Sequence, residues 1–416
     1  MHNSKGQLDR NFNILIFVSI LLGMAGAIYE VSLPLFLKRV GLNWTKIGWI
    51  YSLSALATFL VRTGFGTLSD RIGRKIIYVW SLLMTGIATL FTPFFQSLPM
   101  QILLKSVIEP SSRVREAMHS VMLYDCWPDK FRRVLSRTRG VEFIFHFVGL
   151  LLVSWLIGKL MGKGLETPHG GFIIFSGFVF LMSAGFLHFL FCENREQFSG
   201  NSSIRWRDLI RADLSRPLWV MTFSNFVFNA SVVISHCFVL QLFFQEKYGA
   251  TDSNIFMIGA LHRLIPGITL LFWGHRFQRR LRTWLMVFLI SEGVFIAAPS
   301  FIPAGRFLIA GYTVPFLWVS VLVWLVHDLL GMGLWLPMQQ ELMQKYSRKD
   351  RRGEDMSLAT ALGAIGGVPA PFVAGWLREL PGISPAIALN IPFFVSGVGV
   401  ALSALILLGL PPDSDN

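Results

Sequence analysis

Long apolar runs recur along the whole chain of 416 residues, and polar segments separate them. An α-helix needs about 20 apolar residues to cross a hydrocarbon layer roughly 30 Å thick, and the runs have that length. Charged residues, Gly, Pro or Asn bound each run. The predicted spans are 12–37, 47–69, 76–97, 99–125, 139–162, 170–192, 217–245, 254–275, 283–302, 308–342, 356–378 and 385–410. The pattern therefore predicts an all-α integral membrane protein with twelve transmembrane helices.

The basic residues of the connecting segments alternate between the two sides of the predicted bundle. Lys and Arg accumulate in short loops on the cytoplasmic side of a membrane. The N-terminus and the even-numbered connections hold 24 of the 37 Lys and Arg residues, whereas the odd-numbered connections hold 8. One missed or additional span would destroy this alternation. It therefore supports the number of spans and predicts that both termini are cytoplasmic.

The longest polar stretch between two predicted spans divides the chain near its middle. It covers residues 193–216 and is basic. Six predicted spans lie on each side of it. We expect an N-terminal six-helix bundle over 1–192, a cytoplasmic linker over 193–216 and a C-terminal six-helix bundle over 217–416. A helix lying on the membrane surface over 204–214 is the alternative for part of the linker.

Composition indicates that lipid is the solvent. Of all residues 53% are hydrophobic and 15% are charged, whereas soluble domains carry about 25% charged residues. The net charge of +13 comes largely from the predicted cytoplasmic loops, so it does not indicate nucleic-acid binding. The three cysteines have no spacing typical of a zinc site, and the sequence has no phosphate-binding loop or nucleophile–base motif. We therefore expect no cofactor, no metal and no enzymatic activity.

A short charged segment with two glycines follows the second predicted span. It reads Gly66-Thr-Leu-Ser-Asp70-Arg71-Ile-Gly73-Arg74-Lys75. This resembles the signature loop of the major facilitator superfamily, which lies between the second and third spans. The resemblance implies two pseudo-symmetric six-helix bundles, the major facilitator fold, and transport of a small solute. It also implies a cytoplasmic latch in which Asp70 faces the start of the eleventh span, near 356–357, and Arg74 pairs with Asp125 at the cytoplasmic end of the fourth span. The latch residues are Gly66, Asp70, Arg71, Gly73, Arg74 and Asp125.

A degenerate copy of this segment lies 205 residues later. Residues 69–75 align with 274–280 and share the basic positions, but His275 replaces the Asp and Gln278 replaces the second Gly. Internal duplication of this kind is what two similar halves predict. The missing Asp puts a latch on that side in doubt.

Ionisable and amide side chains interrupt several predicted spans. A charge within hydrocarbon costs several kcal/mol unless it is paired or hydrated, so such residues usually face a water-filled cavity or one another. In the superfamily the first, fourth, seventh and tenth spans line the central cavity, and each of them carries polar residues here. We assign proton coupling to Glu30, Glu109 and Asp328, and contact with the solute to Lys105, Arg113, Glu116, Asn225, Asn229 and His327. The alternatives are that the charges of the fourth span only lock helices together, that the asparagines form interhelical hydrogen bonds, and that His327 and Asp328 serve helix packing.

The fourth span carries the most charge. Lys105, Glu109 and Arg113 stand four residues apart, which places them on one face of a helix. With a rise of about 1.5 Å per residue, Glu30 in the first span lies at a depth where it can meet this face. A carboxylate that loses and regains contact with water can bind and release a proton. Glu30 is therefore the first candidate for the proton carrier.

These features predict a secondary active transporter that works by alternating access and uses a proton gradient. Efflux of small organic molecules is the favoured direction. Uptake of a metabolite or an organic anion, and a non-transporting sensor or scaffold of the same fold, are the alternatives. The expected partners are a small-molecule substrate, protons and the lipid bilayer, without nucleic acid. We expect a monomer in the cell (inner) membrane.

Overall fold

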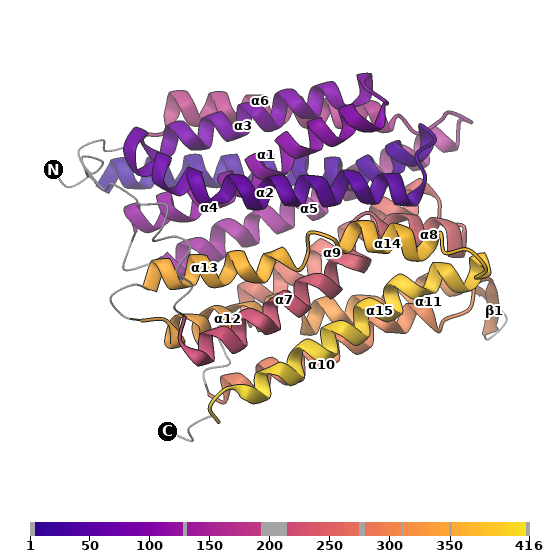
Figure 1. The fold of residues 1–416 in the computed structure, drawn as a ribbon. Helices are drawn as coiled ribbons and strands as arrows, with labels where there is room; N and C mark the ends of the chain where they lie inside the picture. Colours follow the sequence, from indigo (N-terminus) through magenta and orange to yellow (C-terminus); the bar gives the residue numbers. More distant parts are fainter. Residues whose placement is uncertain are drawn as a thin grey trace. The chain divides into compact units, whose positions relative to one another are not determined.

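Helices make up nearly all of the chain that the structure describes (Figure 1). The computed structural model describes residues 5–127, 131–192, 214–273, 279–309, 312–348 and 352–412. The side chains of residues 62–72 and 124–125, among others, lie outside that description. Every predicted span except the start of the tenth coincides with one helix or with two consecutive helices. The expectation of an all-helical membrane fold is confirmed.

The chain forms two compact units. Unit 1 comprises Met1–Val40 and Leu53–Arg205, and unit 2 comprises Gly41–Ser52 and Trp206–Asn416. The helices up to the middle of the chain are α1 (Lys5–Arg39), α2 (Trp44–Ile72), α3 (Arg74–Phe91), η1 (Thr92–Phe94), α4 (Leu98–Cys126), α5 (Phe131–Met161) and α6 (His169–Leu190). Most of the predicted linker, 193–213, lies outside the described residues.

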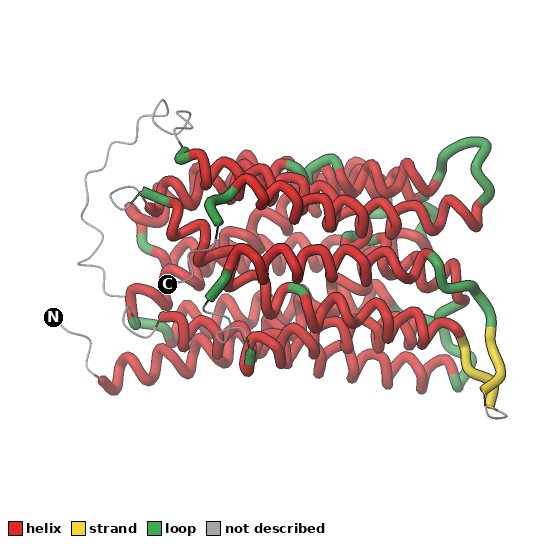
Figure 2. Tube along the Cα trace, turned by 90° about the horizontal axis from the view of Figure 1, so that it is seen from below, coloured by secondary structure: helices red, strands yellow, loops and turns green. Residues whose placement is uncertain are grey.

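The second half contains helices and one short hairpin. The helices are α7 (Arg216–His236), α8 (Val239–Tyr248), α9 (Asp252–Phe272), α10 (Leu281–Ala297), η4 (Ala298–Ser300), α11 (Phe316–Leu330), α12 (Met332–Tyr346), α13 (Arg352–Ile365), α14 (Ala370–Arg378), α15 (Pro385–Ile406) and η5 (Leu407–Gly409). Strands β1 (Arg306–Ile309) and β2 (Tyr312–Pro315) pair antiparallel. Figure 2 shows this hairpin beyond the ends of the helices.

Close helix crossings at glycines occur at corresponding places in both units. In unit 1, α3 crosses α6 at Gly86 and Gly177, where an added Cβ would lie 2.7 Å from a leucine side chain of the other helix. In unit 2, α10 crosses α15 at Gly293 and Gly397, where a Cβ would meet the backbone of the other helix. The first pair joins the third and sixth spans, and the second pair joins the ninth and twelfth. Glycines let two helix backbones approach closely, so both halves use the same device at equivalent helices.

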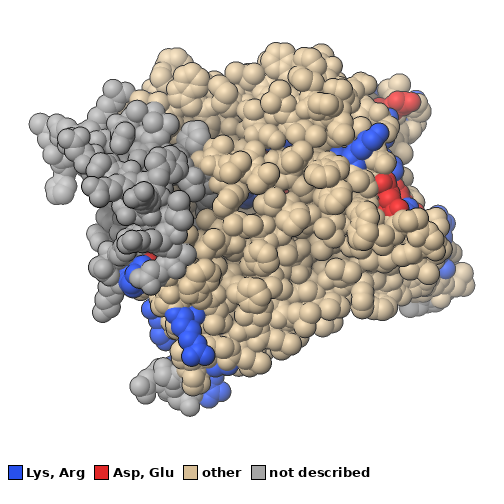
Figure 3. All heavy atoms as spheres, viewed as in Figure 1, with Lys and Arg blue, Asp and Glu red and all other residues tan. Residues whose placement is uncertain are grey.

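The outer surface is the one expected in lipid. Ten helical stretches of the described chain are long and apolar enough to cross a membrane. Large side chains such as Phe189, 82% exposed, and Phe301, 72% exposed, lie on the surface. Figure 3 shows a face of mostly uncharged residues on which Lys, Arg, Asp and Glu gather toward the ends. Exposed apolar surface of this extent is typical of membrane proteins. α2 and α4 fill the places of the second and fourth predicted spans, although α4 is less apolar.

The start predicted for the tenth span is wrong. We predict helix from residue 308, but β1 and β2 occupy this region and α11 begins at Phe316. Residues such as Ile309, Tyr312 and Val314 are aromatic or β-branched and fit a strand as well as an apolar helix. Pro315 follows at the N-cap of α11, where its missing N–H has no cost.

The start predicted for the eleventh span is also wrong. We predict a cap near residues 356–357, but α13 begins at Arg352. The Asp355 carboxylate lies inside this first turn and accepts a hydrogen bond of 2.9 Å from the backbone N–H of Arg348. The span then breaks between α13 and α14, where Pro369 is the N-cap of the second helix.

Candidate functional site

A ladder of four charged side chains follows one face of α4 in unit 1. The Lys105 Nζ lies 2.9 Å from Glu109, and Arg113 lies 3.3 Å from the same carboxylate. Arg113 also lies 3.2 Å from Glu116. The side chain of Lys105 is 9% exposed and that of Arg113 is 57% exposed. These residues, which we call the α4 ladder, are therefore buried at Lys105 and most exposed at Arg113.

α1 contributes two side chains next to the α4 ladder. The Lys105 Nζ lies 5.3 Å from the ring centroid of Tyr29, within cation–π range. Glu30 follows in the sequence, is exposed, and lies within electrostatic range of Lys105 and Arg113. The two helices thus place a third carboxylate beside the cations of the ladder.

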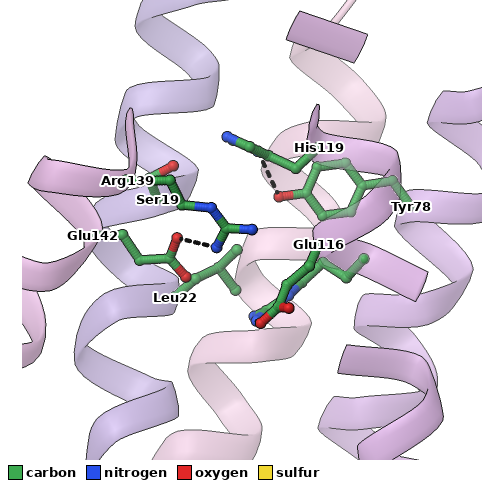
Figure 4. Close-up of a pocket in the computed structure, with 8 residues that line it drawn as sticks. Ser19, Leu22, Tyr78, Glu116, His119, Arg139 and Glu142 are labelled. Carbon is green, nitrogen blue, oxygen red and sulfur yellow. Dashed lines mark hydrogen bonds and ion pairs between the residues drawn. The ribbon is translucent and has the colours of Figure 1, made fainter. Parts of the chain in front are cut away.

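A small polar pocket lies beside the ladder, among α1, α3, α4 and α5 (Figure 4). It is lined by Ser19, Leu22, Tyr78, Arg115, Glu116, His119, Arg139 and Glu142. The Arg139 guanidinium donates to Glu142 at 2.9 Å, and the Tyr78 hydroxyl lies 3.3 Å from the His119 Nδ1. Glu116 belongs to both the pocket and the ladder. The pocket thus continues the polar region of unit 1 into the core.

Two residues that line this pocket, Tyr78 and Arg139, received no role from the sequence. A lone Tyr in an apolar span is indistinguishable in sequence from a packing residue. Arg139 stands at the start of the fifth span, where a basic residue is expected as a cytoplasmic flank. Glu142 lies three residues after Arg139, and an acid and a base at this spacing meet on one face of a helix. This spacing is the one feature of the sequence that could have identified Arg139 as a pocket residue.

The two asparagines of the seventh span bond to other helices of unit 2. The Asn225 amide oxygen accepts a hydrogen bond from Gln339 of α12. The Asn229 amide nitrogen donates to the backbone oxygen of Asn225 at 2.8 Å and to that of Gly363 in α13 at 3.4 Å. Both asparagines therefore make interhelical hydrogen bonds, which is the alternative to the predicted contact with the solute.

Three histidines and one aspartate meet in unit 2, and we call them the His–Asp cluster. His262 of α9 lies 2.7 Å from one carboxylate oxygen of Asp328, and His327 lies 3.3 Å from the other. The Nε2 atoms of His327 and His236, from α11 and α7, are 3.0 Å apart. His327 and Asp328 are almost fully buried. Of these four, the sequence predicts proton coupling for Asp328 and solute contact for His327, and the structure adds His236 and His262.

The structure describes the predicted latch only in part. Gly66, Asp70 and Arg71 lie within α2, but their side chains and that of Asp125 are outside the described part of the chain. Gly73 has a φ of 98° and separates α2 from α3. A residue with a side chain rarely adopts this conformation, so the glycine fits the predicted tight turn. Arg74 is the first residue of α3.

Two helical units with paired charges at membrane depth define a polytopic membrane transporter. The family description of the Major Facilitator Superfamily matches residues 15–371. The chain belongs to this superfamily. It is therefore a secondary transporter of small molecules and not an enzyme.

The chain is similar to transporters from bacteria and mammals. It is 20% identical over 369 residues to Multidrug resistance protein 1 of Bacillus subtilis (strain 168), covering 89% of this chain and 88% of the relative. It is 25% identical over 409 residues to MFS-type transporter SLC18B1 of Mus musculus, covering 90% of this chain and 82% of the relative. For SLC18B1 of Homo sapiens the identity is 26% over 413 residues, with 91% and 83% covered.

Solved structures of the nucleoside transporter NupG share the fold. A mutant form matches with a TM-score of 0.76 at 13% identity, covering 95% of this chain and 99% of that chain. Another NupG structure matches with a TM-score of 0.69 at 13% identity, covering 95% and 98%. At this identity the likeness shows the fold alone. The major facilitator fold expected from the signature loop is confirmed.

Proposed function

We propose that this transporter exports small organic molecules in exchange for protons, and that solute and proton bind along the α4 ladder. The observation that supports this proposal is the exposure of the ladder at Arg113. Charges that only lock helices together are expected to pair out of reach of water. Here the Arg113 guanidinium is 57% exposed and Glu30 is exposed beside it.

The ladder supplies groups suited to a polar solute. Lys105 is held by Glu109 at its buried end, which fixes the orientation of that carboxylate. Arg113 presents a planar fork of donors, and Glu116 presents acceptors one turn further on. We assign solute contact to Lys105, Arg113 and Glu116, with Glu109 as the residue that positions the two cations.

Glu30 is the proposed proton carrier. Its side chain is exposed, which a group that exchanges protons with a water-filled cavity requires, and it lies within electrostatic range of Lys105 and Arg113. A proton on Glu30 removes a negative charge next to these cations and so changes how strongly they attract a solute. Exchange of solute for proton follows because each ligand changes the binding of the other.

Export is supported by the name of one relative. Multidrug resistance protein 1 is named for resistance to drugs, and it aligns with 89% of this chain. We further propose a monomer in the cell membrane with both termini in the cytoplasm, and a cytoplasmic latch formed by the residues of the signature loop. The alternation of basic loops supports this orientation.

The test measures solute flux in proteoliposomes. A thermal-shift screen of a broad metabolite library, repeated at two pH values, supplies the solute. Wild-type protein is expected to move it in response to a pH gradient. Glu30→Gln is expected to retain exchange of labelled for unlabelled solute and to lose the response to pH. Glu166→Gln, in the exposed loop between α5 and α6, is the matched control and should behave as wild type. A Glu30→Gln protein with an unchanged pH response would refute the assignment of Glu30.

Uptake of an organic anion is the second candidate, and the exposed guanidinium of Arg113 favours it. Arg pairs in a bidentate manner with carboxylates. The direction of flux under an imposed pH gradient distinguishes the two candidates. Failure of every solute to move in wild-type proteoliposomes would favour a sensor or scaffold of this fold.

A further inference from the structure

The His–Asp cluster gathers four metal-ligating side chains from three helices of unit 2. α7 contributes His236, α9 contributes His262, and α11 contributes His327 and Asp328. One ligand atom each from His262, His327 and Asp328 lies within 4.8 Å of the others. His236 joins through its Nε2, which is 3.0 Å from the Nε2 of His327. No short sequence motif brings these residues together.

Hydrogen bonds to the backbone and to a serine orient the rings of two histidines. The His327 Nδ1 lies against the carbonyl oxygen of Trp324. A carbonyl oxygen only accepts, so this Nδ1 is assigned as the protonated donor, which leaves the lone pair of a neutral His327 on Nε2. The His236 Nδ1 lies 3.2 Å from the carbonyl oxygen of Val232 and 2.8 Å from the Ser235 hydroxyl, which can donate or accept.

The Nε2 atoms of His236 and His327 face one another. They are 3.0 Å apart, and a carboxylate oxygen of Asp328 lies 3.3 Å from the Nε2 of His327. With Nε2 of both rings unprotonated, three electron-pair donors converge on one point, which is the arrangement that a metal cation needs. A backbone hydrogen bond on the opposite ring nitrogen is also the usual way in which proteins orient a histidine that ligates a metal.

The surroundings suit an ion that stays in place. The side chains of His327 and Asp328 are 3% and 5% exposed, and that of His262 is 15% exposed. The buried ring of Trp324 packs against His262 and His327, with centroid distances of 4.8 Å and 4.5 Å. Arg263 lies within electrostatic range of Asp328, and so does the buried Glu292.

The donor set selects the type of ion. Three imidazole nitrogens with one carboxylate oxygen are typical ligands for Zn²⁺ and neighbouring divalent transition metals. Mg²⁺ and Ca²⁺ prefer oxygen ligands. Bonds of about 2.0–2.1 Å to a tetrahedral ion place the ligand atoms roughly 3.3 Å apart, so the observed cluster needs side-chain shifts of about 1 Å.

We propose that His236, His262, His327 and Asp328 bind one divalent transition metal ion, which joins α7, α9 and α11 within unit 2. This assignment replaces the sequence-based expectations that no metal binds and that Asp328 carries protons. It does not depend on the proposed function, which rests on α1 and α4 in unit 1. Loss of the metal site and loss of proton coupling are therefore separate outcomes.

The first experiment uses the wild-type protein, purified without a histidine tag and stripped with a chelator. Titration with Co²⁺ is expected to produce the visible bands of tetrahedral coordination, saturating at about one ion per chain, and Zn²⁺ should abolish them. Zn²⁺ should raise the temperature of unfolding of the stripped protein, because a ligand that binds only the folded state stabilises it. Mg²⁺ at the same concentration should leave it unchanged.

Two ligand variants and a matched control complete the test. His236→Asn and His327→Asn are each expected to weaken Zn²⁺ binding by at least about 100-fold, since even outer-shell changes cost 10- to 100-fold. His188→Asn changes an exposed histidine of α6 and should bind as wild type. Size-exclusion profiles of the metal-free variants control for folding. Wild-type protein without Co²⁺ bands and without a Zn²⁺-dependent rise in unfolding temperature would overturn the proposal, and so would unchanged binding in both ligand variants.

Discussion

Lys105 illustrates how a charge is accommodated inside the bundle. Its side chain is 9% exposed, and its ammonium group has Glu109 and the ring of Tyr29 as neighbours. The long aliphatic stem allows the charge to reach these partners from a buried helix face. The side chain of Glu109 is itself only 26% exposed. Each partner is therefore needed to compensate the other.

Replacing Lys105 should destabilise the protein through Glu109. Lys105→Met leaves a partly buried carboxylate with Arg113 as its remaining partner in the ladder, and we expect a loss of about 1–3 kcal/mol in the free energy of unfolding. The double variant Lys105→Met/Glu109→Gln should lose less than the sum of the single variants. Unfolding in detergent, followed by heat or denaturant, measures both quantities.

Lys163→Met provides the control for this prediction, because Lys163 is exposed in the loop after α5. Its stability should stay within about 0.5 kcal/mol of wild type. Strict additivity of the Lys105 and Glu109 substitutions would show that the pair has no coupling.

The α4 ladder was accessible from sequence because its members lie on one helix. Spacing of three or four residues is enough to place side chains together on a helical face. The His–Asp cluster was not accessible in this way. His236 and His327 are separated by 91 residues, and only the tertiary fold of unit 2 brings their rings together. Of its four members, the two adjacent residues in α11 gave the sole indication.

At the scale of single helices, α2 begins with an unusual cap. Glu379, which follows α14, accepts hydrogen bonds from the Trp44 backbone N–H at 2.9 Å and from the Thr45 hydroxyl at 2.6 Å. The Asn43 amide donates to the same carboxylate at 3.1 Å. A carboxylate at a helix N-terminus satisfies unpaired donors and interacts favourably with the helix dipole. Trp44 and Thr45 belong with Glu379 in unit 2, so this cap holds the first turn of α2 there.

Removing this cap should have a measurable cost. We expect Glu379→Ala to lower the free energy of unfolding by about 1 kcal/mol, the usual cost of losing an N-cap. Glu166→Ala, at an exposed position of another loop, should have little effect. Thermal unfolding of both variants measures this difference in stability. Equal stability of the two variants would contradict the capping role of Glu379.

The glycine crossings predict a second effect at the level of helices. Gly397→Ala should lower stability by about 1–3 kcal/mol, because the added methyl group meets the backbone of α10 in a close-packed contact. In contrast, no described atom lies within 4 Å of a Cβ added at Gly185 in α6. Gly185→Ala should therefore be neutral or stabilising by about 0.4–1 kcal/mol. A comparison of unfolding temperatures tests this, and equal losses would contradict the packing explanation.

Hydropathy located the helices well and their interruptions poorly. The hairpin over 306–315 and the breaks after Leu330 and Ile365 lie in stretches that are mostly apolar. Hydropathy averaged over a window measures how readily a segment transfers into lipid. It does not distinguish strands, kinks and helices of equal hydrophobicity. The glycine and proline residues at 366–369 mark one break, but similar residues elsewhere lie inside continuous helices, as Pro110 does in α4.

Across the chain, the two units each have their own apolar core. The signature loop and its degenerate copy predicted two similar halves, and the matching crossings of α3 with α6 and of α10 with α15 support that relationship. The assignment of Gly41–Ser52 to unit 2 was not predictable. It depends on contacts with Glu379 and with other residues hundreds of positions away.

The orientation in the membrane is testable with fusions. Green fluorescent protein at the N-terminus or the C-terminus should fluoresce, and alkaline phosphatase at either end should be inactive, because both ends are expected in the cytoplasm. A phosphatase placed in the predicted external loop after residue 302 serves as the positive control. Active phosphatase at one terminus would contradict the count of spans.

Coupling between solute and proton movement is the property on which the proposed function depends. A pH-sensitive dye inside proteoliposomes that contain the wild-type protein records proton movement without an imposed gradient. Addition of a solute gradient should drive protons in the opposite direction, and Glu30→Gln should abolish this signal while labelled solute still exchanges. Solute movement in wild-type vesicles with no accompanying change in internal pH would contradict proton-coupled export.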